Sequence, residues 1–177
     1  AVLVTGLGPV GLATLMLAKA LGANMLIGVE TNPYRIELAK KMGLADYVFA
    51  PDEAYDQIMK VTNGNGVERA FDASASDPGR QLAIRATREW GRIAFVGEGG
   101  TCTFNPSPDI IHGQKTIYGS WVTSLWRMEE LVERLVRWGI QPEDLITDEF
   151  PLEQAGEAYR LMASGNCGKV AVVFPED

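Results

Sequence analysis

One glycine pattern, G-x-G-x-x-G over residues 6–11, constrains the fold of this sequence more than any other feature. It directly follows the apolar run from Ala1 to Thr5 and leads straight into the amphipathic stretch from Leu12 to Leu21. This order predicts a strand, a tight turn and a helix. Such a turn is typical of a dinucleotide site, in which a diphosphate lies against the start of the helix.

Each residue of this turn has a predicted role. Gly6 permits the tight turn out of the strand, Gly8 lets a pyrophosphate approach the backbone, and Gly11 lets the helix pack closely on the sheet. Pro9 suits the first helical turn because no N–H is needed there, and Val10 completes the motif. We predict that all five residues bind the cofactor, although a glycine turn that only packs a helix on a sheet is the alternative.

The second apolar run, from Asn24 to Val29, ends on an acidic residue. Glu30 lies nineteen residues after Gly11, which is the spacing of the ribose-binding acid in dinucleotide sites. A carboxylate there accepts hydrogen bonds from a free ribose 2′-hydroxyl and repels a 2′-phosphate. The sequence therefore predicts NAD rather than NADP.

The composition fits one globular domain or slightly more. The chain has 177 residues, of which 46% are hydrophobic, and a net charge of −7. The acidic balance, without basic runs, argues against nucleic acid or an anionic membrane as a partner. Because no signal peptide and no apolar run near the roughly 18 residues of a membrane span is present, the predicted location is the cytoplasm.

Cysteine and histidine are too scarce for a metal centre. Cys102 and Cys167 are far apart in sequence, and His112 is the single histidine. This chain cannot build a four-ligand zinc site by itself, so we predict no metal ligand, and we interpret both thiols as reduced and structurally incidental. His112 is expected in a loop, with a surface or packing role, and no catalytic residue is predicted.

The remaining sequence alternates between predicted helices and strands. Helices are expected at 33–42, 52–61, 78–90 and 125–138, and strands at 47–49, 67–73, 92–96 and 115–121, with a loop over 98–113. With the first two strands, this predicts an α/β fold with a doubly wound, mostly parallel six-stranded sheet in the order 3-2-1-4-5-6. The ligand would lie across the carboxyl ends of strands one and four. Asp72 and Ser74 would border it, unless they only hydrogen-bond the local backbone.

The end of the chain does not fit this sheet. A turn over 140–144 precedes an extended segment at 146–150, a helix at 152–162 and a strand at 168–174. The last strand is apolar on both faces and should be buried in a sheet whose other strands lie outside this chain. We therefore predict a dinucleotide-binding domain over 1–144 and a C-terminal helix–strand tail over 145–177.

Several segments together resemble the zinc-type medium-chain alcohol/polyol dehydrogenase family, and within it they are most similar to the sorbitol and threonine dehydrogenases. They are residues 4–11, 28–30, 95–97, 118–121, 161–165 and 168–172. The resemblance implies a Rossmann fold that binds NAD and transfers hydride between an alcohol and NAD. In that family a GroES-like catalytic domain, which carries the zinc ligands, precedes the first strand of the coenzyme domain, and the C-terminal tail returns to it. We expect zinc only in the complete enzyme and no activity of this chain alone.

The resemblance also implies further contacts with the cofactor. Arg35 matches a basic position at the adenosine ribose, although it is equally compatible with a solvated charge on a helix. Val96, Ser120 and Val122 match positions whose backbone contacts the nicotinamide carboxamide. Lys169 matches a basic residue of the returning tail that reaches the pyrophosphate.

The sixth predicted strand, Lys115 to Trp121, would form one edge of the sheet. An apolar, aromatic edge without proline favours pairing with a second copy, and the family resemblance also implies a dimer across this edge. The alternative is an edge covered by the following helix through Trp126 and Trp138. For the chain as a whole, two other functions stay open: an S-adenosylmethionine-dependent methyltransferase domain, and a non-catalytic nucleotide-sensing module.

Overall fold

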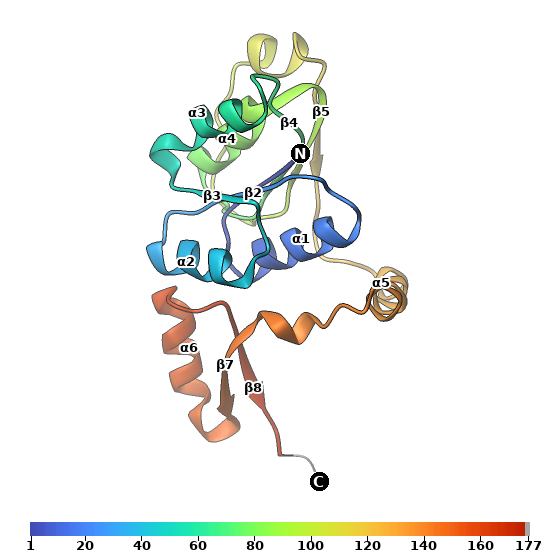
Figure 1. Ribbon diagram of the computed structural model, residues 1–177. Coiled ribbons are helices and arrows are strands. Elements are labelled where there is room, and N and C mark those ends of the chain that lie inside the picture. The colour runs from blue at the N-terminus through green and yellow to red at the C-terminus, as the bar shows by residue number, and fades with distance from the viewer. Residues whose placement is uncertain (176–177) are drawn as a thin grey trace. The chain divides into compact units, whose positions relative to one another are not determined.

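The computed structural model describes residues 1–175, and the chain divides into two compact units. The first unit extends from Ala1 to Ser120, and the second begins at Trp121 (Figure 1). The predicted boundary after residue 144 separates the dinucleotide-binding domain from a tail that would return to a catalytic domain. This boundary stays a prediction.

A six-stranded parallel sheet forms the centre of the first unit. Its strands are β1 (Val2–Thr5), β2 (Leu26–Val29), β3 (Tyr47–Phe49), β4 (Val67–Asp72), β5 (Thr87–Phe95) and β6 (Thr116–Gly119). They lie in the order β3-β2-β1-β4-β5-β6, which confirms the predicted order. Thr5 pairs with Val29 on one side and with Asp72 on the other, so the carboxyl ends of the three central strands meet at one edge.

Helices cover both faces of this sheet. Figure 1 shows α1 (Pro9–Ala20) and α2 (Pro33–Met42) on one face, and α3 (Pro51–Val61) and α4 (Asp77–Ala86) on the other. Each of the four has a proline in its first turn, where the fixed φ suits a helix start. The core between these layers is aliphatic and includes Leu3, Ile27, Val29, Ile58, Val67, Ala70, Ala83 and Ile93. The doubly wound α/β fold is therefore confirmed.

The predicted helix over 78–90 is too long and is corrected by the structure. α4 ends at Ala86, because Thr87 has an extended backbone and its Oγ1 donates a hydrogen bond to the Ala83 carbonyl at 2.6 Å. The backbone N–H of Trp90, a residue with a φ of 61°, donates to the Gly113 carbonyl at 2.8 Å, which ties this segment to the chain before β6. The helical pattern in the sequence therefore continues over residues that form β5.

Two smaller differences concern β6 and the loop before it. β6 covers only the centre of the predicted strand 115–121. The predicted loop over 98–113 contains a π-helical turn, η1 (Ser107–Ile111), after which His112 is exposed. None of these changes moves the carboxyl edge of the sheet.

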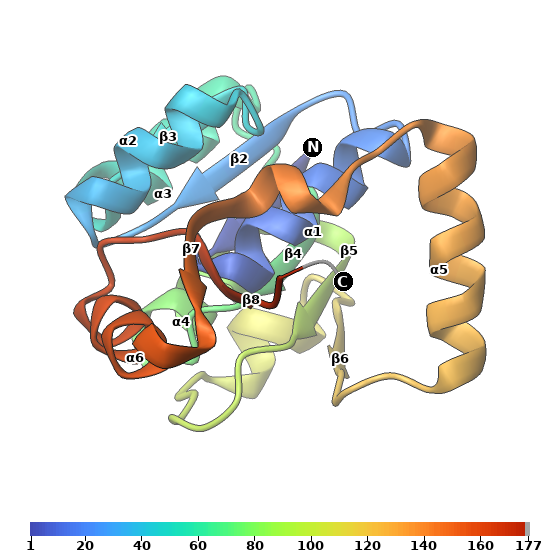
Figure 2. The same cartoon turned by 90° about the horizontal axis from the view of Figure 1, so that it is seen from below.

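The second unit contains α5 (Leu125–Trp138) and a small βαβ arrangement. β7 (Ile146–Pro151) pairs in parallel with β8 (Lys169–Val173), and α6 (Ala155–Ser164) connects them and lies beside both strands (Figure 2). Two short 3₁₀ turns, η2 (Pro142–Leu145) and η3 (Leu152–Gln154), flank β7. The prediction that the last strand has no partner within this chain is wrong, because β7 supplies one. Among residues 1–175, no helix has the length and apolarity needed to cross a bilayer.

Candidate functional site: a cleft at the carboxyl edge of the sheet

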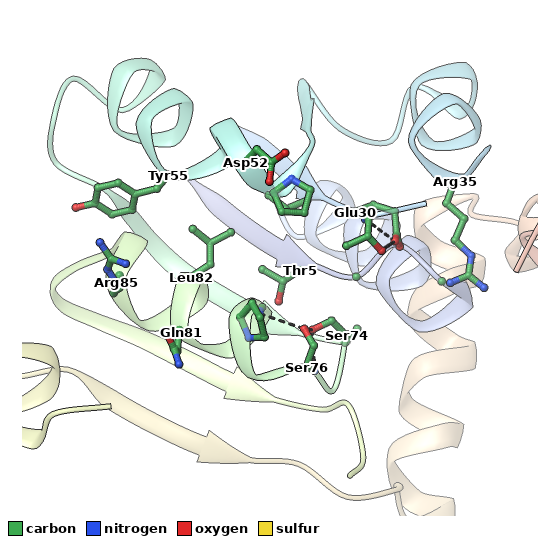
Figure 3. A pocket seen from close by; sticks show the side chains of 18 residues that line it. Thr5, Glu30, Arg35, Asp52, Tyr55, Ser74, Ser76, Gln81, Leu82 and Arg85 are labelled. Carbon is green, nitrogen blue, oxygen red and sulfur yellow. Dashed lines mark hydrogen bonds between the residues drawn. The ribbon is translucent and has the colours of Figure 1, made fainter. Parts of the chain in front are cut away.

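A cleft of about 770 Å³ opens at the carboxyl edge of the first unit's sheet (Figure 3). The ends of β1, β2 and β4 and the flanks of α3 and α4 form its walls. Its lining includes the predicted residues Gly6, Gly8, Glu30, Arg35 and Ser74, together with Thr5, Asp52, Tyr55, Ser76, Gln81, Leu82 and Arg85. The cleft thus lies where the sequence placed the ligand, across the ends of strands one and four.

The three glycines of the turn differ in what the fold requires of them. Gly6 has a φ of +85°, and a Cβ on it would lie 2.7 Å from the backbone of Ser74. A Cβ on Gly11 would lie 1.9 Å from the carbonyl oxygen of Gly6, so α1 can pack here only without a side chain. Gly8 is different, because its φ is −70° and the nearest atom to a built Cβ is Nη1 of Arg35, at 3.6 Å. The fold does not need a glycine at position 8, which leaves the approach of a ligand as the reason for it.

The start of α1 is open toward the glycine turn. Gly8 is the N-cap, and no side chain of the described residues caps the helix. The first N–H groups of a helix have no acceptor within it, and the helix dipole adds partial positive charge at that end. Pro9 stands in this first turn, as the sequence predicted, and Val10 beside it is 53% exposed. The turn can therefore accept an anionic group such as a diphosphate.

Glu30 lies at the end of β2 and is only 6% exposed. Its Oε2 accepts a hydrogen bond from the backbone N–H of Leu7 at 2.8 Å. Its Oε1 accepts from the backbone N–H groups of Thr31 and Asn32, at 2.7 and 2.9 Å, and from the Thr31 hydroxyl at 3.1 Å. The carboxylate therefore joins the glycine turn to the end of β2, a structural role that the sequence did not reveal.

These hydrogen bonds keep Glu30 ionised. Burial raises the pKa of Glu30, but the hydrogen bonds from Asn32, Leu7 and Thr31 together outweigh it, so the pKa lies below its ordinary value. A carboxylate offers about four lone-pair sites, two on each oxygen. From residues 1–175, Oε1 already has three donors, whereas Oε2 has one. Oε2 thus keeps a site for one further donor, such as a sugar hydroxyl.

Arg35 supplies a cation to the same cleft. It lies in the first turns of α2, and its guanidinium is next to Gly8. Its Nε is buried, and among the described residues it has no hydrogen-bond partner. A buried N–H of a charged group that lacks an acceptor is costly, so Arg35 is a candidate for a contact with an anionic group in the cleft.

A second polar cluster lies on the other side of β1, at the end of β4. Asp72 is fully buried; its Oδ1 accepts hydrogen bonds from the Thr5 hydroxyl at 2.9 Å and from the Ser74 hydroxyl at 2.5 Å. Its Oδ2 lies 3.2 Å from Nε of Arg80. Sequence reasoning named Asp72 and Ser74 but missed Arg80. The available signal was that a buried acid needs a cation, and Arg80 lies on the helix that follows.

Comparison with known proteins gives this fold and site a family. Residues 9–137 match the family model described as zinc-binding dehydrogenase. The sequence is 47% identical over 176 residues to the uncharacterized zinc-type alcohol dehydrogenase-like protein YphC of Escherichia coli, covering 99% of this chain and 50% of that protein. The chain belongs to the zinc-binding dehydrogenase family.

Two further relatives agree with this membership. L-threonine 3-dehydrogenase of Pyrococcus horikoshii is 35% identical over 98% of this chain and 51% of its own length. The crystal structure of benzyl alcohol dehydrogenase from Acinetobacter calcoaceticus superposes with a TM-score of 0.86 at 27% identity, covering 98% of this chain and 49% of that one. The chain thus spans about half the length of the dehydrogenases that it matches.

The other predicted contacts of this family member lie outside the cleft lining. The Val96 N–H donates to the Asp72 carbonyl at 2.9 Å, and the Ser120 N–H donates to the Phe95 carbonyl at 3.0 Å, so both backbones continue the edge of the sheet. Val122 and Lys169 belong to the second unit, and their contacts with a cofactor stay predictions. Within residues 1–175, no three His, Cys, Asp or Glu side chains gather in a way that could hold a metal ion.

Proposed function

We propose that this chain is the NAD(H)-binding part of a zinc-dependent alcohol dehydrogenase, and that the cofactor lies along the cleft at the carboxyl edge of the sheet. Arg35 carries the proposal, since it lines the same cleft as Glu30 and its guanidinium lies beside Gly8, the one glycine of the turn that the fold does not require. In this arrangement the adenosine ribose donates to Oε2 of Glu30, and Arg35 donates to a ribose or phosphate oxygen. The diphosphate lies against Gly6, Gly8 and the start of α1.

The nicotinamide half then extends past β1 toward the ends of β4, β5 and β6. The family resemblance assigns the backbone of Val96, Ser120 and Val122 to the carboxamide and Lys169 to the pyrophosphate. A bound NAD would supply the acceptor for a hydride from the alcohol carbon. The residues of this chain bind and orient the cofactor for that step.

We further propose that the zinc ligands and the alcohol site of the complete protein belong to a separate catalytic domain. The relatives that this chain matches are about twice as long, and two of them are named as alcohol and threonine dehydrogenases. We expect the 177-residue chain to oxidise no alcohol, with or without added zinc, in an assay of NADH formation. Zinc-dependent turnover by the purified chain would contradict the proposal that the zinc ligands and the alcohol site lie in a separate domain.

The cofactor proposal is tested by a titration of the chain with NADH, NADPH and S-adenosylmethionine, followed by tryptophan fluorescence. We expect saturable binding of NADH, weaker binding of NADPH and none of S-adenosylmethionine. Binding of S-adenosylmethionine alone would assign the cleft to a different reaction. A variant with Arg35→Leu should weaken NADH binding, because it removes the cation that lines the cleft beside Gly8.

We also propose that the protein forms a homodimer across the β6 edge. β6 is the last strand of the sheet, and Tyr118 on it is 48% exposed. An edge strand offers unpaired backbone groups to the same strand of a second copy, related by a two-fold axis.

A further inference from the structure

The side chain of Arg80 connects separate segments at the carboxyl edge of the sheet. It is 9% exposed, and its Nε lies 3.2 Å from Oδ2 of Asp72, at the end of β4. Its Nη2 donates to the carbonyl of Gly97 at 2.7 Å, and its Nη1 donates to the carbonyl of Thr101 at 3.1 Å. The guanidinium also lies over the ring of Phe95, 5.4 Å from the ring centre. One residue of α4 thus holds both ends of the loop that follows β5.

This loop, residues 97–101, is pressed against the turn that follows β4. A Cβ on Gly97 would lie 2.6 Å from the backbone nitrogen of Ala75, and one on Gly100 would lie 2.0 Å from the Ala75 carbonyl oxygen. The loop has no helix or strand of its own to fix it. Its position depends on this close packing and on the hydrogen bonds to Arg80.

The sheet order places this loop on the nicotinamide side of the cleft. Glu30, at the end of β2, lies on one side of β1, whereas β4 and β5 lie on the other. A dinucleotide whose adenosine ribose is bound at Glu30 must therefore place its second nucleoside toward the ends of β4 and β5. Resting on the proposed function, we infer that Arg80 is a positioning residue that sets the nicotinamide half of NAD(H) by fixing the loop 97–101 to Asp72.

Arginine is suited to this position in a way that lysine is not. A guanidinium presents several N–H donors in a rigid plane, so Arg80 serves a carboxylate and two carbonyl groups at once. A lysine ammonium can keep the charge opposite Asp72, but as a point charge on a flexible stem it cannot reproduce the spread of the three contacts. Arg80→Lys therefore separates loop positioning from charge pairing.

The first test compares NADH with ADP-ribose, which lacks the nicotinamide ring, in binding titrations of the full chain. For Arg80→Lys we expect the Kd of NADH to rise by at least about fivefold and that of ADP-ribose to change by less than about twofold. Arg88→Lys is the matched control, because Arg88 is exposed on β5, pairs with Glu68 and does not line the cleft. The control should leave both affinities unchanged.

The second test measures the order of the loop without any ligand. Cys102 directly follows Thr101, and burial, followed by the charge of Asp77, raises the pKa of its thiol. Alkylation of Cys102 by iodoacetamide, followed by peptide mass spectrometry, should be slow in the unaltered chain and in Arg88→Lys, and faster in Arg80→Lys. The buried Cys167, in the second unit, reports any loosening that is not confined to the first unit.

The outcomes separate this inference from the proposed function. If the unaltered chain binds neither NADH nor ADP-ribose, the proposed function is wrong, and the role of Arg80 falls with it. If both ligands bind and Arg80→Lys weakens them equally or not at all, the function stands and the inference is overturned. Alkylation of Cys102 that is unchanged in Arg80→Lys, or that rises together with that of Cys167, also overturns it.

Discussion

The Glu30 carboxylate accepts four hydrogen bonds from the described residues. It is also the group that we expect to accept a hydrogen bond from the ribose of the cofactor. It therefore has two roles, one in the fold and one in cofactor choice, and the absolute affinity of a Glu30 variant will mix them. The ratio of two affinities removes the common effect on the fold.

Replacing Glu30 by alanine should narrow the preference for NADH over NADPH. The substitution removes both the ribose acceptor and the negative charge that repels a 2′-phosphate, which together correspond to about 1–3 kcal/mol of discrimination. The measurement is the ratio of the two Kd values in the variant and the unaltered chain. Equal affinities for NADH and NADPH in the unaltered chain would show that Glu30 does not select the cofactor.

Glu30 should also contribute to the pH dependence of stability. The pKa of Glu30 is lower in the folded chain than in the unfolded chain. Its contribution to the free energy of unfolding is therefore fully present above the unfolded pKa of about 4.3, and it is lost as the pH falls through the lower folded pKa. Urea unfolding of the unaltered chain and of Glu30→Gln should show a difference in unfolding free energy at pH 7 that shrinks below about pH 4. A difference that stays constant over this range would contradict the sign.

Among the elements, α1 and its glycine turn give the sharpest test. Gly8→Val should abolish most NADH binding, because the branched side chain fills the approach of the diphosphate. The fold should survive, since the φ of Gly8 suits any residue and, apart from its chain neighbours, the nearest described atom to its Cβ position is Nη1 of Arg35, at 3.6 Å. The expected destabilisation is about 1 kcal/mol, from a poorer N-cap residue. Retained binding in a folded variant would leave Gly8 without a ligand role.

Gly11→Val provides the contrasting case on the same helix. Its Cβ would lie 1.9 Å from the Gly6 carbonyl oxygen, so we expect the melting temperature to fall sharply even without ligand. The two variants together distinguish a glycine kept for the fold from one kept for the cofactor.

The order of the elements was predictable from sequence because each strand and helix had a local signal. The prolines that begin the helices and the apolar runs that form the buried strands fixed the alternation, and the crossovers then determined the sheet order. The junction of α4 and β5 was not predictable, since it depends on a hydrogen bond between Trp90 and Gly113, which are distant in sequence.

The candidate site shows the same division. The glycine turn and Glu30 were found because their spacing is local to one βαβ unit. The contacts of Arg80 with the carbonyl groups of Gly97 and Thr101 were missed because backbone acceptors leave no trace in a sequence. The hydrogen bond from Leu7 to Glu30 is of this kind too.

For the whole molecule, NADH should raise the thermal stability of the first unit. A ligand that binds only the native state, at about 100 times its Kd, adds about 2.7 kcal/mol, which for the 120 residues of the first unit corresponds to roughly 10 °C. Because all residues that line the cleft lie in the first unit, differential scanning calorimetry should show the shift in that unit's transition. AMP, which lacks the diphosphate and the nicotinamide half, is the control and should shift it less.

The proposed dimer is also a property of the whole molecule. Tyr118→Lys places a charge on the exposed edge of β6, where a second copy would pair, and lysine is a common device against edge pairing. Light scattering after gel filtration should show a dimer for the unaltered chain and a monomer for the variant. Thr14→Lys, on α1 and away from this edge, is the control. A monomeric unaltered chain would exclude the edge-pairing proposal.

The central place of β1 has a consequence for synthesis on the ribosome. β1 lies between β2 and β4, yet β4 begins about 65 residues later in the chain. At about 5–20 residues per second, one side of this apolar strand has no partner strand for roughly 3–13 s after it emerges. The walls of the cofactor cleft include the ends of β1 and β4, so the cleft cannot form before β4 has paired with β1. A nascent chain therefore becomes able to bind NADH only after this delay.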